Sequence, residues 1–146
     1  LLSTMVQGKS VLNSDQIAFF VEQGYLLLEN ALTDEQLVAL RAGFQEWVNE
    51  SRQFSQSYGQ TLDGRARFDL EPGHTADRTA LRRVSSPIEV SDVYLEVMRD
   101  SRALDAVTQL LGPNVKLNNT KENSKLPGAT TEVQFHQDFW FEPHSN

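Results

Sequence analysis

The sequence predicts an α+β fold in which helices come first and the start of a β-sheet follows. Apolar residues recur at helical spacing in 33–53 and 91–111, and each stretch carries helix-capping residues. From Val115 onward the pattern changes to the alternation typical of strands. We therefore expect a single domain over the 146 residues, with a helical part at about 14–112 and the start of a sheet core at about 113–146.

Composition and charge narrow the classes of function. The chain is 39% hydrophobic and 23% charged, which is typical of a globular domain. Its formal net charge of −7 argues against a nucleic-acid partner and against an anionic membrane surface. The absence of cysteine excludes disulfides and thiolate metal sites, and it favours a cytoplasmic location.

The N-terminal third is expected to hold two helices around a short strand. Ser14 can cap the first helix, and Gly24 is its expected end. Residues 25–28 then form a candidate for a short, buried strand. Thr33 and Gln36 have the spacing of a capping box that starts the second helix. The buried stripe of this helix is predicted to comprise Leu37, Leu40, Phe44, Trp47 and Val48.

The middle of the chain is predicted to be a loop region followed by a broken helix. Residues 55–80 are rich in Gly and Pro without clear periodicity, so we expect loops with one short strand and an exposed His74. The helical stretch 91–111 is expected to break before Ser101, which can cap a second helix, and to end at Gly112. The positions expected to face the core are Val93, Tyr94, Val97, Leu104, Val107 and Leu111.

Two strand candidates follow, separated by a turn at 127–128. The first would place Asn119, Lys121, Asn123 and Lys125 on one face. The second, 132–141, carries Phe135, Phe139 and Trp140 as expected packing groups. So few strands cannot close a barrel, and their unpaired edges suggest a fragment of a longer protein.

The segment His136-Gln137-Asp138 carries the clearest chemistry. On a strand, a spacing of two places His136 and Asp138 on the same face and Gln137 on the other. An imidazole and a carboxylate are two of the three ligands of a 2-His-1-carboxylate iron site. The alternative is a polar pair on a surface strand. His144 lies eight residues past His136, which is too far along a continuing strand for the third ligand, although Pro143 makes a turn possible.

The order of several short segments supports the metal interpretation. They are Gly24-Tyr25, Leu32 to Leu37, Leu110 to Gly112, Lys125 to Gly128, and His136 to Asp138. From about Ser14 to Pro143 the chain resembles the phytanoyl-CoA dioxygenase family of Fe(II)- and 2-oxoglutarate-dependent oxygenases. The resemblance implies a double-stranded β-helix core, also called jelly-roll or cupin-like, with N-terminal helices packed on it and a barrel left incomplete in this chain.

The resemblance also implies a function. His136 and Asp138 would bind Fe(II), while a later histidine and an arginine that anchors 2-oxoglutarate have no counterpart in this chain. We expect a dioxygenase that uses molecular oxygen to hydroxylate an unactivated C–H bond of a small organic substrate. The carboxylate of Asp138 resembles the hydroxylating rather than the halogenating branch, and the fragment alone is expected to be inactive.

Three residues are candidates for binding the cosubstrate. Similar proteins carry amide side chains near Asn119 and Asn123 that hydrogen-bond 2-oxoglutarate, and Arg83, beside Arg82, could reach an anion. The alternative for Arg82 and Arg83 is an ordinary surface position. For Lys121 and Lys125, on the same face as the two asparagines, the alternative is a solvated charge. The rival function is a non-catalytic, cupin-like binding domain with an incomplete metal site.

Overall fold

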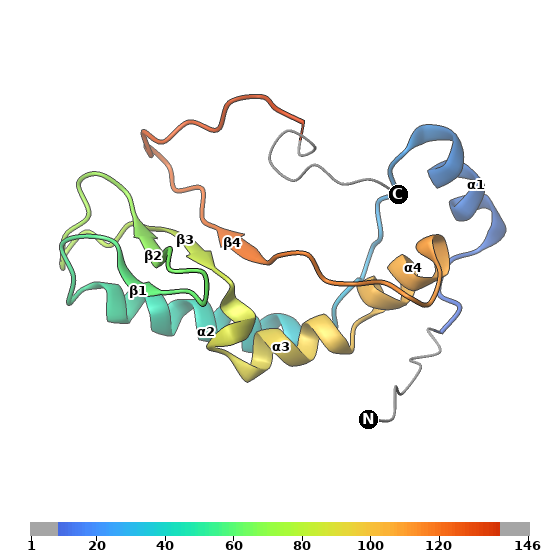
Figure 1. Cartoon of the computed structure of the whole chain (residues 1–146), viewed down its shortest axis with the longest axis horizontal. Helices are drawn as coiled ribbons and strands as arrows, with labels where there is room; N and C mark the ends of the chain where they lie inside the picture. Colours follow the sequence, from blue (N-terminus) through green and yellow to red (C-terminus); the bar gives the residue numbers. More distant parts are fainter. Residues whose placement is uncertain (1–8, 138–146) are drawn as a thin grey trace.

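The computed structural model describes residues 9–137, which form helices and one antiparallel sheet (Figure 1). The helical elements are α1 (Ser14–Gln23), α2 (Asp34–Ser51), the 3-10 helix η1 (Pro87–Glu89), α3 (Asp92–Arg99) and α4 (Arg102–Leu111). The strands are β1 (Tyr58–Gln60), β2 (Ala66–Leu70), β3 (Leu81–Ser85) and β4 (Lys121–Asn123), paired in that order without closing into a barrel. The α+β class is confirmed. The expected order of elements is wrong, because three of the four described strands lie between α2 and α3.

Most of the predicted helix ends are confirmed. The Thr33 hydroxyl accepts from the backbone N–H of Gln36, whose side chain accepts from the backbone N–H of Thr33, which completes the capping box of α2. Ser101 caps α4, and the backbone N–H of Gly112 closes it. The cap of α1 is Asn13 rather than Ser14, because Asn13 forms its own capping box with Gln16.

The core lies between α2 and one face of the sheet. Phe68 of β2 pairs with Tyr58 of β1 and with Val84 of β3, so three strands contribute side chains to one layer. Trp47 of α2 packs on Phe68 and on the Tyr94 ring of α3, as its predicted place in the core requires. Val84 is completely buried, which anchors the central strand against the helix.

Residues 55–80 contain two strands, β1 and β2, rather than the single short strand expected there. The sequence of β2 alternates apolar and polar residues, but Arg67 and Phe68, on opposite faces of the strand, are both buried. Arg67 is buried because its guanidinium donates to the carbonyls of Ser85 and Ser86 and pairs with Glu89 at 2.5 Å. The Arg67 guanidinium is therefore buried with hydrogen-bond partners, as a buried charge requires.

Two predicted strands are absent from the described residues. Residues 25–28 are irregular, and Tyr25 is 63% exposed. Residues 132–137 likewise form no strand, and Phe135 is fully exposed rather than packed. A strand needs a hydrogen-bonding neighbour, and the described part of the chain places none beside either segment. Phe139 and Trp140 lie outside the described residues.

The end of the molecule opposite β1–β3 is formed by α1 and α4 (Figure 1). The Gln109 side chain of α4 accepts from the backbone N–H groups of Val11 and Leu12 and donates to the Leu12 carbonyl, which fixes the segment before α1. Of the positions expected to face the core, Val107 and Leu111 of α4 are 41% and 69% exposed. Within residues 9–137, no helix is both long and apolar enough to span a bilayer.

Candidate active site

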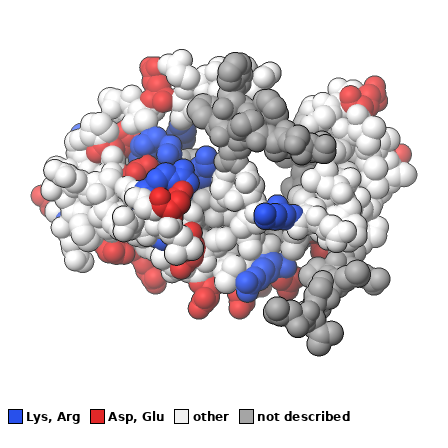
Figure 2. All heavy atoms as spheres, viewed as in Figure 1, with Lys and Arg blue, Asp and Glu red and all other residues white. Residues whose placement is uncertain are grey.

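The face of the sheet turned away from α2 carries a cluster of four charged side chains and one amide, here called the polar face: Asp69, Glu71, Arg82, Arg83 and Asn123. A β-bulge creates it, because Arg83 pairs with Asp69 and Leu81 with Leu70, which leaves Arg82 as an extra residue in β3. Both consecutive arginines therefore reach the Asp69 carboxylate, each at 3.6 Å. Figure 2 shows Lys and Arg side chains gathered at the sheet end of the molecule, with acidic side chains beside them.

Two of the predicted cosubstrate residues meet on this polar face. Arg83 and Asn123 are directly opposed in the β3–β4 pairing. The Arg83 Nε–H donates to Asn123 Oδ1 at 3.1 Å. The third candidate, Asn119, lies before the start of β4, and Lys125 lies after its end, so the shared face predicted for residues 119–125 extends only over the three residues of β4. Lys121, one of the candidates for a solvated charge, is exposed.

His136 is exposed, and its imidazole hydrogen-bonds the Gln134 carbonyl oxygen through Nδ1 at 2.6 Å. A carbonyl oxygen only accepts, so Nδ1 is the donor, and in a neutral imidazole Nε2 would then carry the lone pair. This is the arrangement typical of metal-ligating histidines, in which the other ring nitrogen donates to a carbonyl or carboxylate. The His136 side chain therefore fits the role of a metal ligand. Asp138 and His144 lie outside the described residues.

Residues 9–137 contain no group of three histidine or acidic side chains close enough to hold a metal ion. His74, expected to be exposed, is instead 8% exposed and belongs to the structure of the β2–β3 hairpin. Its Nε2 lies 3.0 Å from the Ser51 carbonyl oxygen, and its Nδ1 accepts from the Ala80 N–H at 2.9 Å. Both ring nitrogens are therefore committed to the backbone.

Sequence reasoning missed a contact between the polar face and the segment that leads to His136. The Thr131 hydroxyl donates to Glu71 Oε2 at 2.5 Å, across 60 residues of sequence. Glu71 is 7% exposed, although glutamate is rarely buried without partners. The presence of a Glu in the Gly/Pro-rich stretch gave no signal of this role, because its partner is so distant in the sequence.

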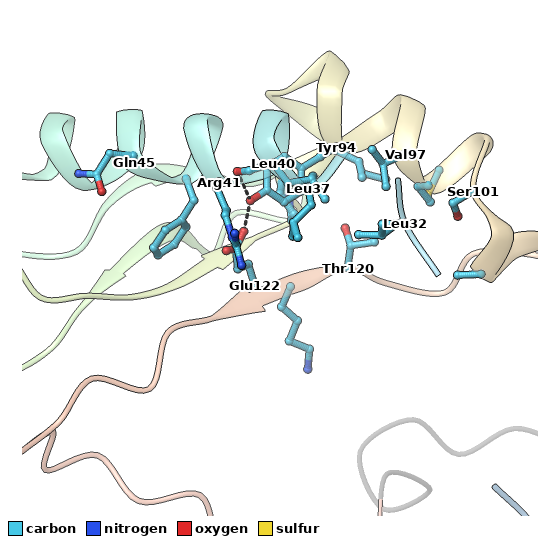
Figure 3. Close-up of a pocket in the computed structure, with 16 residues that line it drawn as sticks. Leu32, Leu37, Leu40, Arg41, Gln45, Tyr94, Val97, Ser101, Thr120 and Glu122 are labelled. Carbon is cyan, nitrogen blue, oxygen red and sulfur yellow. Dashed lines mark hydrogen bonds between the residues drawn. The ribbon is translucent and has the colours of Figure 1, made fainter. Parts of the chain in front are cut away.

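A cavity of about 770 Å³ lies on the other side of β4, among α2, α3 and η1 (Figure 3). Its lining is mainly apolar, with Leu37, Leu40 and Val97 among its walls. The Tyr94 hydroxyl hydrogen-bonds the Glu122 carboxyl group and lies 3.3 Å from the Leu40 carbonyl oxygen. Burial raises the pKa of Glu122, and the hydrogen bond from Tyr94 opposes that rise.

Comparison with known proteins adds a family match. The sequence model of the family described as phytanoyl-CoA dioxygenase (PhyH) matches residues 20–146. A probable alpha-ketoglutarate-dependent hypophosphite dioxygenase of Stutzerimonas stutzeri is 26% identical over 142 residues, covering 91% of this chain and 44% of the relative. An ectoine dioxygenase of Bordetella parapertussis is 30% identical over 136 residues, covering 91% and 40%. The chain thus spans less than half the length of these relatives, and no solved structure matches it.

Proposed function

The chain belongs to the phytanoyl-CoA dioxygenase family, and we propose that the protein containing it is an Fe(II)- and 2-oxoglutarate-dependent dioxygenase. The observation that carries this proposal is the family match, which includes His136 and Asp138. The names of the two relatives, both dioxygenases and one of them alpha-ketoglutarate-dependent, support it. In this proposal the sheet β1–β4 forms part of a double-stranded β-helix, and further strands come from the remainder of the protein.

His136 and Asp138 would hold the iron together with a histidine outside this chain. The hydrogen bond from His136 Nδ1 to the Gln134 carbonyl supports this role, because it leaves the lone pair on Nε2. Ferrous iron, when bound, supplies the activation of molecular oxygen that is coupled to oxidative decarboxylation of 2-oxoglutarate.

Arg83 and Asn123 contribute to binding the dianionic cosubstrate. The Arg83 guanidinium supplies positive charge, and Asn123 accepts from it through Oδ1, which reserves the amide N–H donors for an anion. Asn119 is the weaker candidate, because it lies outside the paired part of β4. The Asp69 carboxylate offsets part of the positive charge of Arg82 and Arg83 and holds both side chains on the polar face.

The substrate in this proposal is a small organic molecule that is hydroxylated at an unactivated C–H bond. The relatives named for ectoine and for hypophosphite favour a small and polar substrate. A non-catalytic binding domain with an incomplete metal site is the rival, and no observation on the described residues favours it over the enzyme.

The test uses the protein extended to the length of its relatives. Anaerobic titration with Fe(II) and then 2-oxoglutarate should produce a charge-transfer absorption band in the visible range. His136→Ala and Asp138→Ala should abolish the band, whereas Glu132→Ala, which removes an exposed carboxylate from the same segment, should retain it. A folded protein with no band in its wild-type form would establish the binding-domain alternative instead.

A further inference from the structure

Glu71 occupies a rigid position at the end of β2. Its backbone N–H donates to the Ala80 carbonyl at 2.9 Å, and its carbonyl accepts from the His74 N–H at 3.1 Å. The buried His74 ring ties the same hairpin to the Ser51 carbonyl at the end of α2. The Glu71 carboxylate is therefore fixed relative to the helix and to the sheet.

The buried carboxylate of Glu71 has two partners on the polar face. Arg82 Nε lies 3.8 Å from Oε1, and the Thr131 hydroxyl donates to Oε2 at 2.5 Å. The Glu71 side chain is only 6% exposed, so its charge depends on these partners rather than on water. A hydrogen bond to a buried carboxylate is among the stronger side-chain contacts in proteins.

Thr131 connects this fixed point to the segment of the proposed metal ligands. It lies between the turn closed by the Ala129 N–H and Leu126 carbonyl, at 3.1 Å, and His136 five residues later. Residues 129–137 form no helix or strand, so no regular backbone pairing sets the path of this segment. The side-chain contact with Glu71 sets that path at Thr131 instead.

We infer that Glu71 is a positioning residue that, through Thr131, fixes the start of the segment that leads to His136. This inference rests on the proposed function. Its proposed effect is to fix where this segment starts. Arg82 lies beside the carboxylate, and the bulge in β3 is what places Arg82 within reach.

The experiment compares hydroxyl removals in the extended protein. Thr131→Val deletes the donor to Glu71, and Thr131→Ser retains it. Thr75→Val is the matched control, because the Thr75 hydroxyl accepts from the Arg78 N–H in the same hairpin and is exposed. The anaerobic dissociation constant for Fe(II) and the thermal unfolding midpoint are measured for each variant, and for Glu71→Ala and the double variant Glu71→Ala/Thr131→Val.

Thr131→Val and Glu71→Ala should each weaken Fe(II) binding about tenfold, while Thr131→Ser and Thr75→Val bind as the wild type does. The double variant should bind Fe(II) no more weakly than either single variant, because both substitutions remove the same contact. If wild-type protein binds Fe(II) and Thr131→Val binds it equally well, or if the two losses add, the positioning role is wrong and the proposed function stands. If the wild-type protein fails to bind Fe(II), both the positioning role and the proposed function are wrong. Should Glu71→Ala not fold, Thr131→Val alone decides.

Discussion

The two faces of the sheet β1–β4 are stabilised by different kinds of interaction. On the face toward α2, Phe68 and Val84 are almost fully buried and pack against Trp47. On the polar face, the side chains of Arg82 and Arg83 retain about a quarter to a third of their exposure and are held by carboxylates. No described helix packs on this second face (Figure 1). The difference indicates that apolar packing on one face maintains the fold, while the other face carries charged side chains held by ion pairs.

Large-to-small substitution in the core should give the largest effect. Phe68→Ala removes a ring that stacks on Tyr58 and contacts Trp47, so the free energy of unfolding should fall by about 3–5 kcal/mol. Asn123→Ala on the polar face, the control, should cost less than about 1 kcal/mol. Urea denaturation of both variants measures the contrast, and similar losses would contradict the division between the faces.

A charge change on the polar face should act on the cosubstrate rather than on the fold. Arg83→Met should weaken 2-oxoglutarate binding by about tenfold, because a charge-assisted hydrogen bond is lost. Its ion pair with Asp69 is partly exposed, so stability should change little. Anaerobic titration measures the affinity, with Lys121→Met on the exposed part of β4 as the control. Equal affinities for Arg83→Met and wild type would remove Arg83 from the cosubstrate site.

The smallest effect should come from Glu122, on the cavity side of β4. Its pKa is raised in the folded state by burial, so the folded protein binds this proton more tightly than the unfolded chain does. The stability gained in this way is present below the ordinary pKa of 4.5 and is lost as the pH rises through the higher folded-state pKa.

Glu122→Gln should therefore gain stability relative to the wild type on going from pH 4 to pH 7. Unfolding midpoints across that range measure the difference, with Glu96→Gln on the exposed surface of α3 as the control. A difference between wild type and Glu122→Gln that stays constant with pH would show that Glu122 titrates alike in both states.

Local signals in the sequence predicted the helices well. Thr33 and Gln36 satisfy each other's backbone N–H groups within one helical turn, and Ser101 and Gly112 act within their own helix. The helix stripe that contains Trp47 was also recognisable, because its spacing is a property of a single element. For the candidate site, the sequence indicated Arg83 and Asn123, which lie opposite each other in the β3–β4 pairing.

Features that depend on distant partners were not predictable in the same way. Arg67 is buried only because Glu89 and three backbone carbonyls contact its guanidinium, so its burial had no signal in the sequence of β2 itself. Residues 25–28 have strand-like composition without a neighbouring strand. Glu71 and Thr131 are 60 residues apart, and neither has a local pattern that indicates the other.

The bulge in β3 has a consequence for insertions and deletions. Leu81 opposes Leu70, Arg83 opposes Asp69 and Val84 opposes Phe68, so residue 82 is the one that regular pairing does not require. A homologous chain shorter by one residue at this point could keep the same core register on both sides. It would lose the arginine partner of Glu71. Length variation at position 82 would therefore alter the charges of the polar face and leave the packed face of the sheet unchanged.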